Sequence, residues 1–452
     1  MIPTTEKLSL ATALAAARET RSLQIGAHIL DQTPRVFGEH FDGQPAVIIA
    51  DENTFRVAGR TVNEAFKAQG RTVLEPLILR APDLYAESRF VNEVETALRT
   101  HNAIPVAVGS GTINDLTKLA SHRVGRAYMC VATAASMDGY TAFGASITHE
   151  GLKQTFFCPA PVAVLADLDV ICAAPGLMNP WGYADLVAKV TAGADWILAD
   201  ALGAEPIDTQ AWNIVQGRLG EMIADAPGVA ARKPAAVERL VEGLMLGGFA
   251  MQSAKSSRPA SGAEHQFSHL WDMQHHTHNG QAPSHGFKVG IGTLAVTALY
   301  EELFRQPIEQ LDVERCVAAW PAEDFWVARA RELLGEGELA DSAVKEIRAK
   351  HSTPEQLRAQ LTLLRSIWST LREQLQAQLR PFAELRQKLQ DVGGPTEPEH
   401  IGITRERLRQ SYWQAWCIRR RFTVLDLAVR TGLLDTCLGS IFGPNGVWPI
   451  KN

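Results

Sequence analysis

Residues 104–115 read IPVAVGSGTIND, a short apolar run followed by two closely spaced glycines. The run Ile104–Val108 predicts a buried strand, because its residues are apolar and β-branched types are common among them. Gly109-Ser110-Gly111 predicts a tight turn, and the residues after it predict a helix. A strand, a glycine turn and a helix in this order direct free backbone N–H groups and the positive end of the helix dipole to one place.

Such a turn is suited to the pyrophosphate of a nucleotide cofactor. The third glycine of the GxGxxG pattern is missing, however, so the motif is incomplete. In the alternative interpretation the glycines serve only the backbone angles of a strand-to-helix turn. The turn taken alone leaves both interpretations open.

Further strands are predicted on both sides of this turn. Short apolar runs at 46–50 (AVIIA), 72–79, 127–132 and 162–167 alternate with helical patterns near 58–69 and 87–100. Apolar strands separated by helices predict a parallel sheet that is covered on both faces. We therefore expect residues 1–175 to form an α/β, Rossmann-like dinucleotide-binding domain.

From residue 176 onward the pattern is helical. Apolar residues recur at helical spacing in 184–202, 235–254, 289–304 and 322–334. Residues 341–392 are rich in Gln, Arg, Glu and Leu and predict a charged helical extension. We expect residues 176–452 to form an all-α domain that binds metal and substrate, with the active site in the cleft between the domains.

The amino-acid composition argues against several classes of protein. The chain has 452 residues, 46% hydrophobic and 21% charged, with a formal net charge of -6, which argues against nucleic-acid binding. No apolar run is long enough to span a bilayer, and the apolar stretch at 8–17 predicts an amphipathic helix rather than a signal peptide. The six cysteines are scattered and form neither a disulfide framework nor a zinc-binding pattern, so we expect them to be reduced thiols. We expect a cytoplasmic protein without a membrane segment.

Polar residues follow two of the predicted strands. Asp51 comes directly after AVIIA, where an acid accepts hydrogen bonds from a cofactor ribose and disfavours a 2′-phosphate. A capping aspartate is the equally weighted alternative. Thr133-Ala134-Ala135-Ser136 follows the strand at 127–132, and its hydroxyl groups could reach a nucleotide.

Histidines gather between positions 265 and 285. They are His265, His269, His275, His276, His278 and His285. His265 and His269 are four residues apart in a predicted helix and share a face. Imidazoles bind zinc, nickel and iron, and a catalytic site adds a carboxylate and an open position.

We therefore expect His265 and His285 to be metal ligands. Asp185, expected to open a helix at the inter-domain cleft, is the candidate carboxylate. The alternative for Asp185 is a surface acid paired with Lys189 at i+4. His275, His276 and His278 are expected in a solvated loop. The alternative for His269, if it has no role at the site, is a core histidine with its hydrogen bonds satisfied.

Five motifs in order carry a family resemblance. They are GSGTIND, TAASMDGYTAFGASI, GYADLVAKVTAGADW, SRPASGAEHQFSH and SHGFKVGIGTL. Together they resemble the glycerol-1-phosphate dehydrogenases, a branch of the superfamily of iron-type alcohol dehydrogenases, glycerol dehydrogenases and dehydroquinate synthases. The resemblance is strong over 45–303 and weaker at RRRFTVLDLAVRTGLLD.

The resemblance implies roles for particular residues. The implied metal ligands are Asp185, His265 and His285. The implied cofactor contacts are Asp51, Gly109, Gly111, Thr112, Ile113, Asn114, Asp115, Thr133, Ala134, Ala135, Ser136 and Ala142. The implied substrate contacts are Asp138, Asp185 and His269, and Asp138 and His269 are also the implied catalytic residues. Two positions depart from the family: Ser110 replaces a frequent glycine, and Ala142 replaces a serine that often contacts the cofactor.

The implied reaction is hydride transfer from NAD(H) or NADP(H) to C2 of dihydroxyacetone phosphate, giving sn-glycerol 1-phosphate. One divalent metal is implied, zinc first and nickel or iron otherwise, in a homo-oligomer of two or more chains. Arg258, Lys288 and Lys153 are the candidate partners of the substrate phosphate. The alternatives are a dehydrogenase of an unphosphorylated polyol, and a catalytically silent nucleotide- or metal-binding assembly protein.

Overall fold

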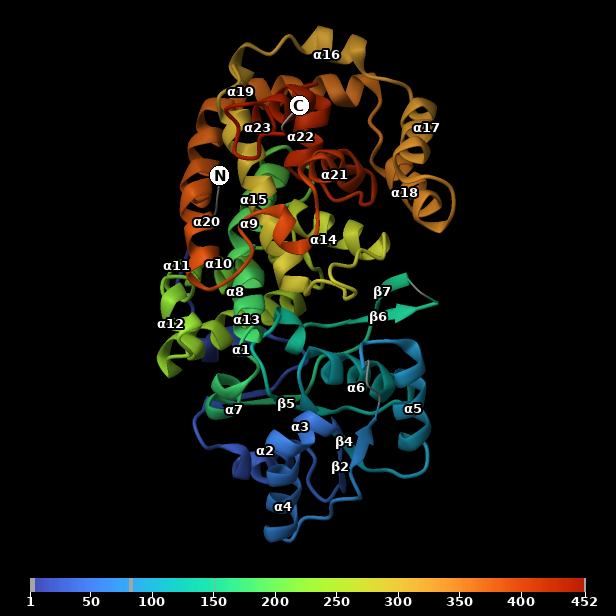
Figure 1. Cartoon of the computed structure of the whole chain (residues 1–452), viewed down its shortest axis with the longest axis vertical. Helices are drawn as coiled ribbons and strands as arrows, with labels where there is room; N and C mark the ends of the chain where they lie inside the picture. The colour runs from blue at the N-terminus through green and yellow to red at the C-terminus, as the bar shows by residue number, and fades with distance from the viewer. Residues whose placement is uncertain (1–4, 81–83, 151, 451–452) are drawn as a thin grey trace.

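The computed structural model describes residues 5–80, 84–150 and 152–450. It shows two regions stacked along the long axis of the molecule, a smaller one that contains the main sheet and a larger helical one (Figure 1). The hairpin β6 (Ala145–His149) and β7 (Leu152–Phe156) extends from the sheet region toward the helices.

The sheet has six strands in the order β1-β8-β5-β4-β2-β3, and every neighbouring pair is parallel. The strands are β1 (Ser22–Gly26), β2 (Ala46–Asp51), β3 (Leu77–Leu79), β4 (Ile104–Gly109), β5 (Met129–Ala132) and β8 (Ala163–Asp167). The expectation of an α/β fold with a parallel sheet is confirmed.

Both faces of the sheet are buried, which explains why its strands are continuously apolar. Successive side chains of a strand point to opposite faces. Ile48 of β2 packs in a cluster with Phe37, whereas Ile49 belongs to the larger cluster on the other face, with Leu116. The helices of this region are α2 (Thr33–His40), α3 (Glu52–Thr54), α4 (Arg60–Ala68), α5 (Ser88–Leu98) and α6 (Gly111–Arg123), with a π-helical turn at Phe55–Gly59.

Three local predictions differ from the structure. The strand expected at 72–79 is reduced to β3, with one isolated bridge between Val73 and Ala46. Pro76 lies between these two pieces and lacks the N–H group that a continuous ladder needs. The strand β1 and the hairpin β6–β7 were not expected from the sequence.

The helical region confirms the expected change of pattern. Its helices are α7 (Leu168–Ala173), α8 (Met178–Val187), α9 (Lys189–Ala201), α10 (Thr209–Gln216), α11 (Leu219–Met222), α12 (Ala226–Ala230), α13 (Pro234–Ala254), α14 (Ala263–Met273), α15 (His285–Phe304), α16 (Val313–Ala319), α17 (Glu323–Leu334), α18 (Glu338–Lys350), α19 (Pro354–Gln378), α20 (Phe382–Asp391), α21 (Arg405–Cys417), α22 (Val424–Arg430) and α23 (Leu434–Ile441). The single helix expected at 184–202 is two helices, which meet at Ala188.

The charged extension at 341–392 is helical, as expected, and consists of most of α18 with α19 and α20. Helix α19 begins with a capping box at Thr353 and buries one stripe of residues, including Leu357, Leu361 and Leu364. This spacing of apolar residues is typical of an amphipathic helix that packs on a core.

The first described helix lies with the helical region. Helix α1 (Leu10–Ala16) packs against α13, far along the sequence (Figure 1). The division into 1–175 and 176–452 stays a prediction, and it does not anticipate this docking of the first helix. Among the described residues, no helix is both long and apolar enough to cross a membrane.

Candidate metal centre and cofactor edge

Three helices bring the predicted metal ligands together. Asp185 lies in α8, His265 in α14 and His285 in α15, and α15 packs against both other helices. One ligand atom of each residue lies within 4.8 Å of the other two. Within the described part of the chain, this is the one group of His, Cys, Asp or Glu side chains with such spacing.

The position of Asp185 corrects one expectation. Asp185 lies in the last turn of α8 rather than at a helix start, and its side chain is completely buried. The alternative of a surface acid is therefore wrong, although the pairing with Lys189 is present. Burial follows from the close packing of α8 against α15: a Cβ added to Gly286 would lie 1.9 Å from the carbonyl oxygen of Trp181.

Lys189 joins two carboxylates of the site. Its Nζ lies 2.9 Å from Oδ1 of Asp185 and 2.7 Å from Oδ2 of Asp138, and its side chain is fully buried. The backbone N–H of Asp138 also donates to Oδ2 of Asp185, at 3.1 Å. A buried ion triad of this kind is held rigidly, because each charge needs its partners when water is excluded.

These contacts shift the ionisation of the site. Burial favours the neutral acid, but the charge of Lys189 and the hydrogen bond from His265 hold the pKa of Asp185 well below its usual range. Burial and the negative charge of Asp185 raise the pKa of Asp138, against the opposing effect of Lys189. The structure thus keeps Asp185 as an anion, the form that binds a cation.

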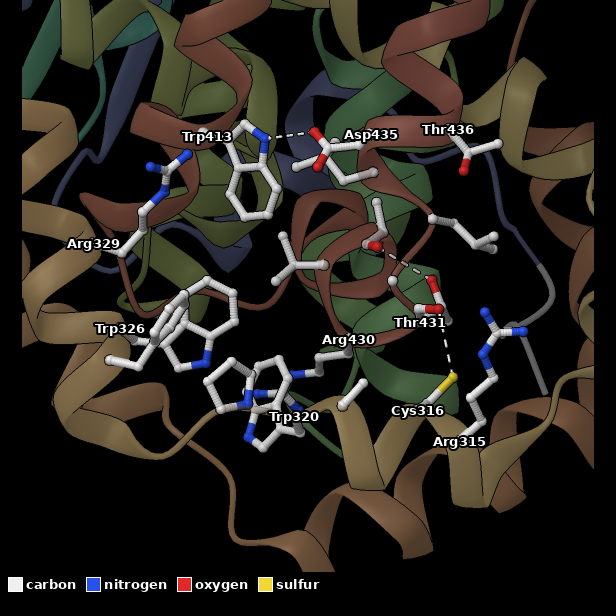
Figure 2. Close-up of a pocket in the computed structure, with 18 of the residues that line it drawn as sticks. Arg315, Cys316, Trp320, Trp326, Arg329, Trp413, Arg430, Thr431, Asp435 and Thr436 are labelled. Carbon is white, nitrogen blue, oxygen red and sulfur yellow. Dashed lines mark hydrogen bonds between the residues drawn. The ribbon is translucent and has the colours of Figure 1, made fainter.

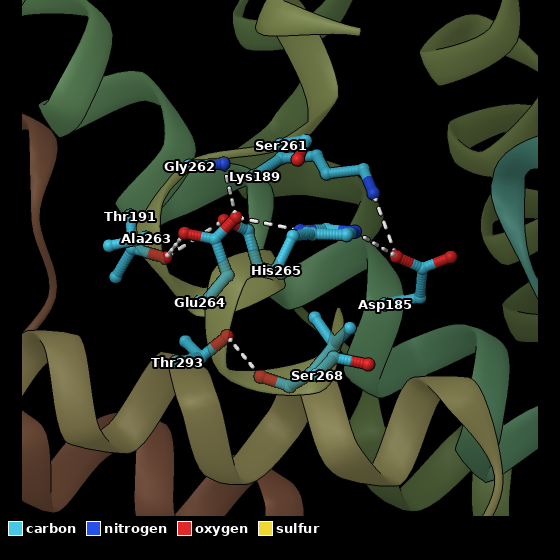
Figure 3. A network of polar contacts seen from close by, with 12 residues as sticks. Asp185, Lys189, Thr191, Ser261, Gly262, Ala263, Glu264, His265, Ser268 and Thr293 are labelled. Atoms are coloured by element: carbon cyan, nitrogen blue, oxygen red, sulfur yellow. Dashed lines mark hydrogen bonds and ion pairs between the residues drawn. The ribbon is translucent and has the colours of Figure 1, made fainter. Parts of the chain in front are cut away.

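His265 lies between two carboxylates, as Figure 3 shows. Its Nε2 is 3.6 Å from Oδ1 of Asp185, and its Nδ1 is 2.7 Å from Oε1 of Glu264. Burial lowers the pKa of His265, but the hydrogen bonds to Asp185 and Glu264 outweigh it and raise the pKa. Sequence reasoning missed Glu264, although its position directly before His265 was the available signal.

The donor set fits a divalent metal. Two imidazoles and one carboxylate are common ligands of zinc and other divalent transition metals, and three protein ligands leave a position open. The ligand atoms are close together, and the carboxylate is ionised by its surroundings. The three residues of this cluster can therefore hold one metal ion.

The two predicted substrate residues border this cluster. Asp138 begins the short 3-10 helix Asp138–Tyr140 and contacts Lys189, as described above. The ring centroid of His269 lies 6.2 Å from that of His265 and 6.4 Å from that of His285. Both side chains are thus placed beside the metal cluster, although their roles stay predictions.

The predicted cofactor residues gather at one edge of the sheet. Asp51 ends β2, the Gly109 turn follows β4, and Thr133 follows β5. These strands are neighbours in the order β5-β4-β2, so their carboxyl ends lie side by side. The chain leaves β2 toward β3 and returns to β4 on the other side, which makes this edge the switch point where α/β sheets bind ligands.

Close packing requires a glycine at position 109 of the turn. Neither Gly109 nor Gly111 has a positive φ, so left-handed geometry is not the reason. A Cβ on Gly109 would lie 2.4 Å from Cβ of Ile113, and one on Gly111 would lie 2.4 Å from Cε of Met137. The interpretation that only backbone angles require the glycines is therefore wrong for Gly109, because Cβ of Ile113 cannot move away as the end of the Met137 side chain beside Gly111 can.

Several predicted cofactor residues direct their side chains into the protein. Oδ1 of Asn114 accepts from the hydroxyl of Tyr128, and Oδ2 of Asp115 accepts from the N–H of Ser146. Ile113 is fully buried. These residues, with Thr112, form the first turns of α6. The N–H of Asn114 already donates to the carbonyl oxygen of Ser110, so the turn offers a cofactor only the N–H groups that come before Asn114.

The side chain of Lys118 holds the loop at residues 139–144, which lies beside the glycine turn. Its fully buried ammonium group donates to the carbonyl groups of Gly139, Ala142 and Gly144. Ala142 packs against Met251 in a small apolar cluster. Sequence reasoning did not single out Lys118, because a lysine in the third turn of an amphipathic helix is usually exposed.

Asp51 caps a helix, as its alternative interpretation proposed. Its Oδ1 accepts from the N–H groups of Asn53 and Thr54 and forms a capping box at α3. Both bonds use the same oxygen, so the cap does not occupy Oδ2. The capping role and the ribose role are therefore compatible. Ser110 is the N-cap of α6 without a side-chain bond.

The three candidate partners of the substrate phosphate differ in their surroundings. Arg258 is buried, and its guanidinium donates to the carbonyl groups of Asp195 and Phe422, so it holds the protein interior together. Lys288 is buried and paired with Asp272. Lys153 lies in β7, and its side chain is outside the described part of the structure.

The histidine loop is only partly solvated. His275 is exposed, whereas His276 is buried and bonded to the carbonyl oxygen of Ile401 and to Arg407. The expectation that His276 lies in a solvated loop is therefore wrong. His278 forms a backbone bridge with Gln281. The loop connects α14 to α15, and His276 attaches it to the segment before α21. The loop contributes no atom to the metal cluster.

A hollow of about 860 Å³ lies elsewhere in the helical region. Figure 2 shows that Trp320, Trp326 and Trp413 line it, with Arg315 and Arg329 nearby. It lies between the helices α16–α17 and the end of the chain. None of its lining residues belongs to the metal cluster or the cofactor edge, so it is not part of the candidate site.

Comparison with known proteins places this arrangement in a class. The family description "iron-containing alcohol dehydrogenase" matches residues 24–175, the sheet region. Glycerol dehydrogenase from Schizosaccharomyces pombe has a similar fold, with a TM-score of 0.60 at 15% identity over 93% of this chain and 90% of that one. The fold is thus the two-part fold of this dehydrogenase superfamily.

Curated relatives define the family within that class. Glycerol-1-phosphate dehydrogenase (NAD(P)+) of Halalkalibacterium halodurans is 35% identical over 66% of this chain and 74% of its own length. The protein of the same name from Bacillus licheniformis is 27% identical over 94% of this chain and 92% of its own length. The chain belongs to the glycerol-1-phosphate dehydrogenase family, a family of oxidoreductases.

Proposed function

We propose that this chain reduces dihydroxyacetone phosphate to sn-glycerol 1-phosphate, with NAD(H) or NADP(H) as the hydride donor and a divalent metal at the active site. The observation that carries the proposal is the buried cluster of Asp185, His265 and His285, in a chain of the glycerol-1-phosphate dehydrogenase family. Zinc is the first candidate, and nickel or iron would accept the same nitrogen and oxygen ligands.

The chain's own residues would divide the work as follows. Asp185, His265 and His285 hold the metal, which when bound supplies a Lewis acid for the ketone oxygen. Asp138 and His269, beside this cluster, bind the hydroxyl group of the substrate and begin the path of the proton to solvent. Lys189 holds Asp138 in place through the contact of 2.7 Å.

The cofactor would bind at the carboxyl ends of β2, β4 and β5. The first backbone N–H groups of α6, from Gly111 onward, face the pyrophosphate, and the helix dipole favours its negative charge. Oδ2 of Asp51, which the helix cap does not use, accepts from the ribose hydroxyl. The nicotinamide ring supplies the hydride, and the protein orients it toward the substrate.

The decisive experiment is a substrate comparison. NADH oxidation is measured with dihydroxyacetone phosphate and with dihydroxyacetone, and the product is identified by chiral analysis. A site built for a phosphate should prefer the phosphorylated ketone by about 100-fold or more in kcat/KM, because polar groups are left unpaired without it. The expected product is sn-glycerol 1-phosphate.

Two other outcomes would replace the proposal. Equal kcat/KM values for the two ketones would indicate a dehydrogenase of unphosphorylated polyols. Bound metal without substrate-dependent oxidation of NADH or NADPH would indicate a silent binding or assembly protein. A homo-oligomer of two or more chains is part of the proposal, and light scattering of the purified protein measures it.

A further inference from the structure

Glu264 is a buried acid directly behind a proposed metal ligand. Its side chain is fully buried, and its Oε1 lies 2.7 Å from Nδ1 of His265. The imidazole ring therefore lies between Glu264 on one side and Asp185 on the other (Figure 3). Burial of a carboxylate costs free energy unless partners compensate its charge, so the partners of Glu264 show what the group does.

The carboxylate of Glu264 is fixed at both oxygens. The backbone N–H of Gly262 donates to Oε1, the oxygen that also faces His265. The hydroxyl of Thr191, in α9, donates to Oε2 at 2.9 Å. The bond from Gly262 holds Oε1 beside the histidine, and the bond from Thr191 satisfies Oε2.

This arrangement decides which nitrogen of His265 is available. Both oxygens of Glu264 accept, Oε1 from the N–H of Gly262 and Oε2 from the hydroxyl of Thr191, so the carboxylate also meets His265 as an acceptor. Nδ1 of His265 must then carry the proton and donate. Nε2 is left to face Asp185, at 3.6 Å, inside the ligand cluster.

The other histidine of the cluster, His285, contacts a hydroxyl group. Its Nδ1 lies 3.4 Å from the hydroxyl oxygen of Ser268. At His265 the corresponding contact of Nδ1 is the carboxylate of Glu264, at 2.7 Å. A carboxylate behind an imidazole makes it a stronger metal ligand than a hydroxyl does.

We propose that Glu264 is a positioning residue of the metal centre: it fixes the ring of His265 with Nε2 toward the metal and strengthens metal binding. The inference rests on the proposed function, because it takes Asp185, His265 and His285 as the ligand set. It adds a residue that the sequence motif does not distinguish from an ordinary helix-start acid.

Glu264 also stabilises the fold, and the experiment must distinguish this structural effect from its effect on His265. Through Thr191 it ties α9 to the start of α14, next to Gly262. Loss of this tie would weaken the fold without acting on His265. Thr191→Val removes the tie and leaves the contact between Glu264 and His265, so it is the matched control.

The test compares metal affinity in wild type and Glu264→Gln, a variant of nearly the same shape. Metal-free protein is titrated with Zn²⁺ against a chromophoric chelator at fixed pH. Glu264→Gln should bind Zn²⁺ about 10- to 100-fold more weakly, the usual effect of removing an outer partner of a metal-bound histidine. With Co²⁺ in place of Zn²⁺, its visible absorption spectrum should differ from that of wild type.

The control variant should behave differently. Thr191→Val should keep a Zn²⁺ affinity within a few-fold of wild type. The thermal unfolding of each metal-free variant shows whether it is folded. Saturating Zn²⁺ should restore most of the kcat of Glu264→Gln, because Glu264 acts through the metal and does not touch the substrate.

The outcomes separate this inference from the proposed function. Wild-type Zn²⁺ affinity in folded Glu264→Gln overturns the role of Glu264, whereas a wild type that binds no metal overturns the metal centre itself. If Glu264→Gln does not fold, ¹⁵N NMR of the histidines in zinc-loaded wild type decides. Zinc bound through Nδ1 of His265 would contradict the proposal, and a proton on Nδ1 with zinc on Nε2 supports it.

Discussion

The cofactor edge and the metal cluster are built in different ways. At the cofactor edge, the groups offered to a ligand are backbone N–H groups and the oxygen of a half-buried acid, Asp51, all within short segments after strands. At the metal cluster, the side chains come from α8, α14 and α15 and are held by buried ion pairs. The first depends on local chain geometry, and the second on helix packing.

This difference predicts how each region tolerates substitution. A buried charge that loses its partner has no water to replace it, so a change in the metal cluster should be costly. A change at the cofactor edge meets solvent and screening ions, so its effect should be small and specific to the ligand. Substitutions in the two regions should therefore differ in the size of their effects.

The largest effects should come from the metal ligands. Asp185→Ala, His265→Ala and His285→Ala should each lose the bound metal and lower kcat/KM on the order of 1000-fold or more, because several kcal/mol of charge stabilisation are removed. Metal content after desalting and steady-state kinetics measure this. Full activity with unchanged metal content in any two of the variants would remove the assignment.

A histidine outside the cluster provides the control. His275 is exposed and has a φ of 52°, a conformation that asparagine tolerates well. His275→Asn should keep wild-type metal content and activity. A loss as large as that of His265→Ala would mean that the histidine loop, rather than the helices, holds the metal.

The next effect concerns stability and Lys189. Lys189→Met removes the cation that faces Asp138 and Asp185 and leaves one buried and one partly buried carboxylate without it. The metal-free protein should lose about 3–5 kcal/mol in its free energy of unfolding, as buried ion pairs do when one partner is removed. Urea unfolding measures the loss.

Added Zn²⁺ should restore part of this stability, because a ligand that binds only the folded state stabilises it. Lys7→Met is the control, since Lys7 forms an exposed pair with Glu221. It should unfold at the same urea concentration as wild type. Equal midpoints for Lys189→Met and Lys7→Met would contradict the contrast between buried and exposed charges.

The smallest effect should come from Asp51. Asp51→Ser should raise kcat/KM for NADPH relative to NADH by about 3- to 10-fold, because a carboxylate near the ribose repels a 2′-phosphate and solvent screens part of the repulsion. Serine is also a good N-cap, so α3 should remain intact. The cofactor ratio is measured at fixed low salt.

Asp208→Ser is the matched control for this experiment. Asp208 is the N-cap of α10, away from the sheet edge, and its side chain accepts from the N–H of Ala211. Its substitution should leave the cofactor ratio unchanged. If Asp51→Ser behaves in the same way, Asp51 is only a helix cap, and cofactor recognition rests on the glycine turn.

The sequence by itself determined the features that depend on neighbouring residues. The apolar run before Gly109 predicted β4 and its parallel neighbours, because burial on both faces leaves a continuous apolar pattern. The motifs and their order also pointed to Asp185, His265 and His285 as one ligand set. Where a local rule was overlooked, as with Pro76, the predicted strand was too long.

Only the tertiary structure decided the surroundings of those residues. The fold buries Asp185 against Lys189 and brings Asp138 into contact with the ammonium group of the same lysine. It places Glu264 beside Nδ1 of His265. It also buried His276 and directed Lys118 to three carbonyl groups. Helical periodicity says which residues share a face, but which helix covers that face depends on contacts between segments that are far apart in the chain. The charge and orientation of each group are fixed by those contacts.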